Sequence, residues 1–481
     1  MTTRSGASPY DPTNPPSHLN LADHFLEHRL RVGDGDRVAL HLPDREVSYR
    51  QVRDRSIEWA RALVERGIRR EERVLIALPD DLEFVACLFG TLRLGAVAVI
   101  TNPQLEREAC RRQIEYVRPR LVATHHSTAD TFKQAALGLL SDSRFLVVGE
   151  ASDPASFEQV VRSASPTTPP IAPTHRDDPA IWLWSGGTTG SPKAVVQTHR
   201  SFANTTELYG LRTLAFGPED ITLSIPKLYF GYATGSNLFF PFAVGGSAVL
   251  FPDAPTPERL FDLIEDRRPT ILINVPTMIQ RMLDEPTAAA RDLSSLRLAT
   301  SAGEALPAPL YHRWRQTYEV ELLDGLGTAE MWHIFLTNRP GDVKPGTLGR
   351  VVEGFEVDVR DADGMPLPDG ETGRLWVRGD SRALGYWQNL DKTRSSFFGE
   401  WFVGGDMVSR DEDGYVTYCG RGDDAMKVTG RWLVPKEVVG ATGRANLFRR
   451  LSKRGSRRGS RSAIRHRVCD QVDMKARSSD I

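Results

Sequence analysis

The sequence predicts an α/β protein: a large N-terminal domain of doubly wound α/β subdomains, a small antiparallel β subdomain, and a C-terminal domain that is mostly missing or disordered. Between residues 74 and 323, short apolar runs alternate with segments of helical spacing, the pattern of βα units around a parallel sheet. Near Gly354 the apolar period changes to two, around turn sequences at 361–364 and 368–370, which is typical of antiparallel hairpins. Beyond Gly440 neither period continues.

Length and composition narrow the class of protein. The 481 residues exceed what one hydrophobic core usually serves, and 40% hydrophobic with 26% charged residues is typical of a globular protein. The net charge of −1 argues against nucleic acid or membrane as the main partner. The N-terminus carries no apolar stretch of a signal peptide, and the four cysteines, Cys87, Cys110, Cys419 and Cys469, fit no disulfide or metal framework. We therefore expect reduced thiols and a cytoplasmic protein.

The domain organisation follows from where periodicity begins and ends. We expect a flexible arm over 1–18 and a large domain over 19–420, with its α/β part reaching about 353 and its β subdomain covering about 354–420. Residues 421–424 are expected to be a hinge. Residues 425–481 are expected to be a truncated or frame-shifted C-terminal remnant that ends in a basic tail, because Arg, Ser and Gly crowd this stretch. Nucleic-acid binding through that tail is a weaker alternative.

Local signals place the helices and strands of the α/β part. Ser48 can cap a helix that Gly67 ends, and Thr256 with Pro257 opens another helix, which runs through Leu263. Further helices are expected at 82–94, from 198, at 277–283 and at 310–318. Strands are expected at 74–78, 96–100, 121–124, 145–148, 180–184, 221–225, 247–251, 271–275, 296–300 and 320–323. The Pro/Ser/Thr-rich stretch 154–173 is expected to be a linker.

One loop dominates the candidate site. The apolar run 180–184 leads into Ser-Gly-Gly-Thr-Thr-Gly-Ser-Pro-Lys over 185–193. Glycines let backbone N–H groups approach an anion, hydroxyls donate hydrogen bonds, and a lysine adds charge, so this loop is suited to phosphate. It is not a Walker A loop, because Pro192 precedes Lys193. Taken alone, the run could also be a flexible surface loop, although this alternative is less favoured.

Two more glycine-bearing polar loops follow predicted strands, at 301–304 and 324–330. In open parallel sheets ligands bind beyond the carboxyl ends of the strands. Three such loops on one rim therefore predict a binding site there.

Five stretches, in order, resemble the motifs of adenylate-forming enzymes, the superfamily of acyl-CoA synthetases, peptide-synthetase adenylation domains and luciferase. They are the phosphate loop 185–193, the adenine-side loop 301–307, Gly-Thr-Ala-Glu at 327–330, the ribose-binding stretch 401–406 and the hinge motif 420–430. The match runs from about residue 19 to about 438. Within the superfamily the chain is most similar to the benzoate-CoA ligase group, through residues 20–25, 226–235 and 330–342.

The resemblance implies ATP-dependent activation of an aromatic carboxylic acid (benzoate, anthranilate or hydroxybenzoate) to an aryl-adenylate, with ATP, Mg²⁺ and coenzyme A as cofactors. It implies catalytic roles for Lys193, Glu330 and Arg421, with Glu330 as the metal ligand and Asp423 as the hinge. The residues implied to bind ATP or AMP are Ser185, Thr188, Thr189, Gly190, Lys193, Gly303, Glu304, Asp324, Gly325, Thr328, Asp406 and Arg421. The residues implied to line the acyl pocket are Tyr229, Phe230, Tyr232, Gly235, Ala302, Gly303, Leu326, Gly327 and His333.

Several residues have an ordinary structural alternative. Glu330 could be an exposed carboxylate at a helix start, and Asp406 and Arg421 could be a turn carboxylate and a surface arginine. Phe230 and Tyr232 could be core aromatics, and His333 could be a buried structural histidine.

The chain departs from the family pattern in three places. Ala194 replaces a glycine, and Ala329 replaces a threonine whose hydroxyl normally reaches the α-phosphate. The C-terminal domain that carries the family's late catalytic lysine is not found. Loading of an acyl carrier protein instead of CoA, and a binding protein without catalysis, therefore stay open as alternatives, as does a homodimer.

Overall fold

The computed structural model describes residues 10–149, 153, 155–186, 192–422, 426–428 and 431–433. The chain divides into two compact units, one formed by residues up to 356 together with 378–402, the other by 357–377 and the chain from 403 onward. The expected hinge residue Asp423 and most of the expected remnant and tail over 425–481 lie outside the described residues.

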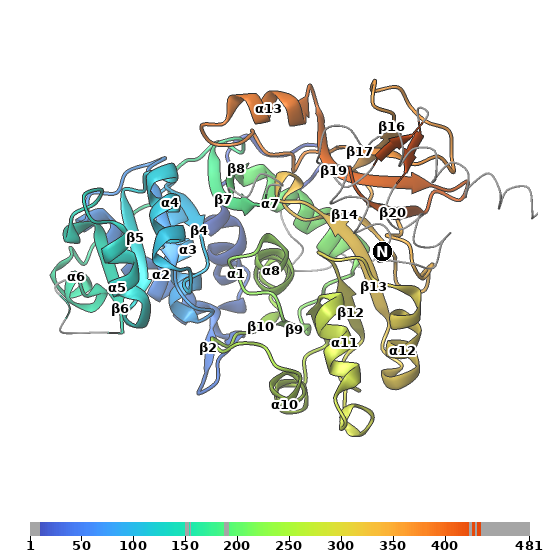
Figure 1. Ribbon diagram of the computed structural model, residues 1–481. Coiled ribbons are helices and arrows are strands. Elements are labelled where there is room, and N and C mark those ends of the chain that lie inside the picture. Colours follow the sequence, from blue (N-terminus) through green and yellow to red (C-terminus); the bar gives the residue numbers. More distant parts are fainter. Residues whose placement is uncertain are drawn as a thin grey trace, which may run out of the picture. The chain divides into compact units, whose positions relative to one another are not determined.

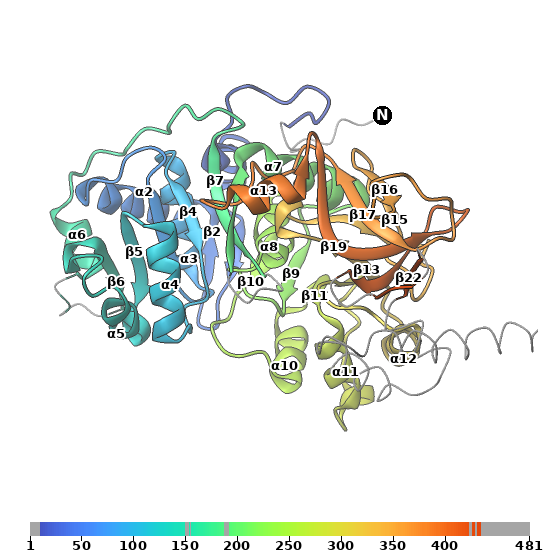
Figure 2. The ribbon, with the colours of Figure 1, turned by 45° about the horizontal axis from the view of Figure 1, so that its top comes forward.

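A six-stranded sheet forms one part of the first unit (Figures 1 and 2). All neighbours are parallel except the last pair, which is an antiparallel hairpin. The strands, in spatial order, are β6 (Phe145–Val148), β5 (Leu121–His125), β3 (Arg73–Ala77), β4 (Val97–Ile100), β7 (Pro179–Ser185) and β8 (Lys193–Thr198). Apolar side chains of α4 (Arg107–Val117) and α5 (His126–Ala135), such as Ile114 and Phe132, share one core with this sheet.

A nine-stranded sheet forms the other part of this unit. Its central strands are parallel and both edges are antiparallel. The strands, in spatial order, are β15 (Arg350–Val351), β14 (Ile334–Thr337), β13 (Leu322–Gly327), β12 (Leu298–Ser301), β11 (Ile271–Asn274), β9 (Ile221–Ser224), β10 (Ser247–Val249), β1 (Val38–His41) and β2 (Glu46–Ser48). Residues of α10 (Pro257–Arg267), α11 (Pro276–Asp284) and α12 (Ala308–Tyr318) share a core with this sheet, with Trp314 fully buried.

Contacts between further helices join these two parts. Phe89 of α3 (Leu82–Arg93) stacks on Phe242 of α9 (Phe240–Val244), with ring centroids 5.7 Å apart, and α2 (Tyr49–Glu65) lies beside α3. The remaining helical elements of this unit are η1 (Asp23–Glu27), α1 (His28–Arg31), η2 (Asp34–Asp36), η3 (Asp142–Arg144), α6 (Phe157–Ser163), α7 (His199–Thr205), η4 (Thr206–Thr213), α8 (Gly231–Thr234), η5 (Gly235–Phe239), η6 (Ala288–Ala290), η7 (Ala329–Met331) and α13 (Leu390–Ser396). No helix among the described residues is long and apolar enough to cross a bilayer.

The predicted α/β class is confirmed, with two corrections. The sheets are mixed, because antiparallel strands close both sheets at their edges. The stretch 154–173 is not only a linker, because it contains α6. Phe157 of this helix is fully buried and stacks on Trp59, with the ring centroids 4.0 Å apart. The buried side chains of Phe157 and Val160 anchor this short helix despite the Pro/Ser/Thr-rich sequence around it.

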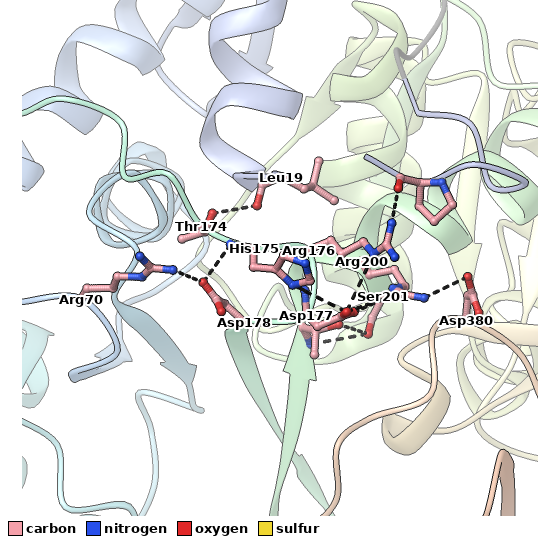
Figure 3. A network of polar contacts seen from close by, with 12 residues as sticks. Leu19, Arg70, Thr174, His175, Arg176, Asp177, Asp178, Arg200, Ser201 and Asp380 are labelled. Carbon is pink, nitrogen blue, oxygen red and sulfur yellow. Dashed lines mark hydrogen bonds and ion pairs between the residues drawn. The ribbon is translucent and has the colours of Figure 1, made fainter. Parts of the chain in front are cut away.

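The segment 10–19 is exposed over much of its length but is anchored to the first unit at both ends and at Pro15, whereas a flexible arm was expected over 1–18. Tyr10 is only 4% exposed. Figure 3 shows how the stretch that precedes β7 holds this segment: the Thr174 hydroxyl donates to the carbonyl of Leu19 at 2.7 Å, and Arg176 donates to the carbonyl of Pro15. Arg200, which pairs with Asp177 at 2.8 Å, extends the same polar network.

The second unit is built from strands. β17 (Gly373–Arg378) lies between β16 (Glu356–Arg360) and β19 (Trp401–Arg410), and β20 (Val416–Arg421) pairs with β19 in antiparallel register. The hairpin of β21 (Met426–Val428) and β22 (Arg431–Leu433) also belongs to this unit, while the short β18 (Phe397–Phe398) belongs to the first. The period-two pattern after Gly354 thus predicted strands correctly.

Candidate active site

The predicted phosphate loop joins the two strands of the β7–β8 hairpin. Ser185 and Lys193 face each other in the register of that hairpin, so the hairpin fixes both ends of the loop. Thr188, Thr189 and Gly190 lie outside the described residues. The Lys193 ammonium lies 5.9 Å from the centroid of the Tyr386 ring, the outer range of a cation–π contact.

Glu330 is buried, with 5% of its surface exposed, in the short helix η7. It is therefore not the exposed helix-start carboxylate of the structural alternative. Its Oε1 accepts two hydrogen bonds, from the Ser185 hydroxyl at 2.7 Å and from the Tyr386 hydroxyl at 2.8 Å. The Ser185 contact joins the end of the glycine-loop hairpin directly to η7.

The residues around Glu330 have structural tasks of their own. Thr328 caps η7, because its hydroxyl accepts from the N–H of Met331 at 3.3 Å. The side chain of Gln197 donates to the carbonyl of Ala329 at 2.7 Å. Ala329 itself has no hydroxyl, and the hydroxyl of the neighbouring Thr328 is already used to cap η7.

The stretch 324–327 is strand rather than loop, which corrects the expected loop boundary. It continues β13 and pairs with β14. A Cβ at Gly327 would lie 2.4 Å from the His333 carbonyl, and one at Gly325 would lie 2.7 Å from the Leu336 carbonyl. Both glycines are therefore needed for the close approach of the two strands.

Two acidic residues predicted to bind nucleotide differ in environment. Asp324 is 6% exposed, and burial raises its pKa to about 7. Glu304 is exposed and accepts from the N–H and the hydroxyl of Thr277, at 3.0 and 2.5 Å. Glu304 thus stabilises the first turn of α11, a structural role that its motif did not indicate. The neighbouring Gly303 has a φ of 85°, in the left-handed region that favours glycine.

The predicted acyl-pocket residues form a buried and an exposed group. The Tyr232 hydroxyl hydrogen bonds Thr300 at 2.6 Å, and His333, 3% exposed, lies with its ring 5.4 Å from that of Tyr232. Gly235 lies against the His333 ring, while Phe230 is 55% exposed and Tyr229 is half-buried beside it. Ala302 is also buried, and Leu326 is half-buried.

Burial sets the protonation state of His333. It lowers the pKa of the imidazole to about 3, so the ring is neutral near pH 7. The carbonyl of Tyr232, 2.9 Å away, can only accept, so Nε2 carries the proton. The preceding residue, Trp332, has a φ of 63°, an uncommon backbone conformation for a residue other than glycine. Its ring packs against that of Phe202, with the ring centroids 4.3 Å apart.

The second unit holds the other two predicted nucleotide residues. Asp406 and Arg421 are opposite each other on β19 and β20, and Arg421 donates to Asp406 Oδ1 at 2.8 Å. Asp406 is 6% exposed. The two residues form an ion pair on adjacent strands, so Asp406 is a buried strand residue and not a turn carboxylate, while Arg421 is exposed at the surface.

Sequence reasoning missed Tyr386 and Gln197. Tyr386 contacts a residue 56 positions earlier in the chain, and Gln197 one 132 positions later. No local spacing signals such contacts, although the Gly-Tyr pair at 385–386 could have marked a tight turn followed by a buried aromatic.

A family model described as AMP-binding enzyme matches residues 26–387. The chain belongs to this family. The AMP-binding match ends within the first unit and includes Ser185, Lys193, Glu330 and Tyr386.

Curated members of the family are similar over most of this chain. The 4-hydroxybenzoate–CoA/benzoate–CoA ligase of Rhodopseudomonas palustris is 36% identical over 87% of this chain and 78% of its own length. The benzoate–CoA ligase of Thauera aromatica is 34% identical over 89% of this chain and 81% of its own length.

Solved structures show the same fold. An anthranilate CoA ligase in complex with anthranoyl-AMP has a TM-score of 0.85 at 37% identity, covering 90% of this chain and 83% of that one. A benzoate CoA ligase from Burkholderia xenovorans has a TM-score of 0.79 at 34% identity, covering 87% of this chain and 82% of that one. The predicted family resemblance is thus confirmed.

Proposed function

We propose that this protein is an AMP-forming aryl-CoA ligase that activates benzoate or a small substituted benzoate, such as anthranilate or a hydroxybenzoate. The observation that carries the proposal is the buried Glu330, which Ser185 at the end of the glycine-loop hairpin holds at 2.7 Å. The similarity to aryl-CoA ligases supports the choice of an aromatic acid.

The first half-reaction joins the acid to AMP. A carboxylate oxygen of the acid attacks the α-phosphorus of ATP, the bond to the bridging oxygen breaks, and pyrophosphate leaves. Lys193 and the hydroxyls of the glycine loop would hold the phosphates, because two anions must approach each other. In the second half-reaction the thiol of CoA attacks the acyl carbon, loses its proton and expels AMP.

The residues present suit Mg²⁺. This ion usually takes one or two carboxylates and completes its shell with water and substrate phosphates, so a single buried glutamate is sufficient. The described residues contain no cluster of three His, Cys, Asp or Glu side chains for an all-protein site. In this proposal Glu330 holds Mg²⁺, which supplies charge neutralisation at the phosphates.

The other predicted residues take their roles within the same proposal. Gly303, Glu304, Asp324, Gly325 and Thr328 would lie along the nucleotide. Asp406 would accept the ribose hydroxyls and Arg421 would reach ribose or phosphate. The aromatic acid would lie among the acyl-pocket residues named above. The cytoplasm is the expected location, since ATP and CoA are available there, and a homodimer remains a prediction.

Mass spectrometry tests the proposal. The protein is mixed with Mg·ATP and a panel of aryl acids, with and without CoA. Aryl-CoA formed over many turnovers supports the full reaction, and aryl-AMP alone supports the first half-reaction. Aryl-AMP that passes to an acyl carrier protein but not to CoA would favour carrier loading. Neither product, with an aryl acid still raising the melting temperature, would favour a binding protein.

A further inference from the structure

The segment 383–387 adds to the free edge of β8 as a short extended stretch. The N–H of Leu384 donates to the carbonyl of Val196 and the N–H of Trp387 to that of Ala194, at 3.0 and 2.9 Å. A third bond brings the segment to η7, since the N–H of Ala383 donates to the backbone carbonyl of Glu330 at 2.8 Å. The segment is therefore fixed to both the β7–β8 hairpin and the helix that carries the buried carboxylate.

Tyr386 is the side chain that this segment sends to the site. It is 8% exposed, clusters with Val195 and Ala383, and meets Phe397 edge-on at 5.6 Å. Its N–H donates to the Thr393 hydroxyl at 3.0 Å. Backbone and ring are thus both held, so the position of the phenol oxygen is determined before any ligand binds.

The two hydroxyl donors leave a specific part of Glu330 for a ligand. A carboxylate offers two oxygens with about four lone-pair directions. Ser185 and Tyr386 both donate to Oε1, and among the described residues no hydrogen bond to Oε2 is found. We propose that Tyr386 is a positioning residue which, together with Ser185, fixes Glu330 so that Oε2 is presented to the Mg²⁺ of Mg·ATP. This inference rests on the proposed function.

A second hydroxyl that contacts the same segment, that of Tyr116 on α4, gives a matched control. The Tyr116 hydroxyl donates to the carbonyl of Trp387, next to Tyr386, but has no contact with Glu330. Tyr116→Phe and Tyr386→Phe each remove one hydroxyl that touches this region. Both keep the ring, so a general loosening of the segment would appear in both variants.

Isothermal titration calorimetry measures the affinity of each variant for ATP, once in the presence of Mg²⁺ and once in the presence of EDTA. Partners that orient a metal ligand typically change metal affinity 10–100-fold. We therefore expect Tyr386→Phe to weaken Mg·ATP binding about tenfold or more, to leave metal-free ATP binding unchanged, and to raise the Mg²⁺ concentration needed for half-maximal aryl-AMP formation. Tyr116→Phe should leave the ratio of the two ATP affinities as in the wild type. Ser185→Ala tests the same geometry from the other donor, should Tyr386→Phe not fold.

A double-mutant cycle completes the test. In a Glu330→Gln background, Tyr386→Phe should have no further effect on Mg·ATP binding, because the carboxylate that it positions is gone. Equal weakening of Mg·ATP and metal-free ATP, the same change in Tyr116→Phe, or an undiminished effect in Glu330→Gln would overturn the inference. A wild type that binds Mg·ATP in this way but forms no aryl-AMP would contradict the proposed function while leaving the positioning role intact.

Discussion

Replacing Gly235 by alanine should push the His333 ring out of its place in the acyl pocket. The added Cβ would lie 2.4 Å from Cδ2 and 2.6 Å from Nε2 of His333, whereas ordinary contacts begin at 3.4 Å. The ring would have to retreat by about 1.0 Å. It cannot do so freely, because Tyr232 and Ser236 hydrogen bond its Nε2 at 2.9 and 3.2 Å.

The cost of this substitution is steric only. Gly235 has φ −71° and ψ −68°, a helical conformation that alanine adopts without strain. Overpacking of a buried site costs about 1–3 kcal/mol, so the free energy of unfolding should fall by that amount. Because the displaced ring is predicted to line the acyl pocket, we expect KM for the aryl acid to rise about tenfold, which is the size of effect that one methylene group has in such a pocket.

Urea unfolding and steady-state kinetics measure the two effects, with Gly90→Ala as the control. A Cβ at Gly90 would lie 2.7 Å from the carbonyl of Ser56 and 2.8 Å from Cβ of Trp59, so this variant should lose stability as well. Gly90 lies in the contact between α2 and α3, away from the proposed pocket, so its KM should not change. The reasoning is refuted if Gly235→Ala keeps the wild-type KM, or if both variants raise KM equally.

Three other changes have expected outcomes. Ala329→Thr restores the hydroxyl that the resemblance implies at the α-phosphate, and pyrophosphate release should accelerate about tenfold or more; an unchanged rate would count against that role. His333→Gln should make stability less sensitive to acid. The folded-state pKa is about 3 against 6.5, so the neutral histidine contributes stability above pH 6.5 that is lost as the pH falls towards 3. Urea unfolding between pH 4 and 7 gives the slope of the free energy of unfolding against pH. This slope should be smaller in the variant than in the wild type by up to about 1.4 kcal/mol per pH unit. Asp406→Asn removes the carboxylate that pairs with Arg421 and should weaken ATP binding about tenfold in calorimetry. The melting temperature should change little, because Arg421 is itself exposed. An unaltered ATP affinity would contradict the predicted role of Asp406.

Elements with local signals could be predicted from the sequence. Ser48 forms the expected cap, with Gln51 completing a capping box, and Thr256 caps α10 as expected. These signals act within one turn of helix, so no tertiary information is needed. The helix α6 could not be predicted, because it depends on the stacking of Phe157 on a tryptophan about a hundred positions earlier.

The candidate site shows the same limit. Strand–loop alternation and motif resemblance indicated Ser185 and Glu330, and the structure brings these two together. The sequence could not indicate that Tyr386 donates to the same carboxylate, or that Glu304 accepts hydrogen bonds from the first turn of α11. Such partners are chosen by tertiary packing, and the residue types alone do not reveal them.

The short stretch beside β8 bears on how a minimal fragment of this protein should be cut. An unpaired edge strand offers its N–H and C=O groups to any other chain. A fragment ending near residue 353 would leave β8 open at Ala194 and Val196, both buried in the intact chain. Such a fragment should aggregate even though every residue of both sheets is present. A soluble fragment must extend past Trp387, the residue at which the AMP-binding match also ends.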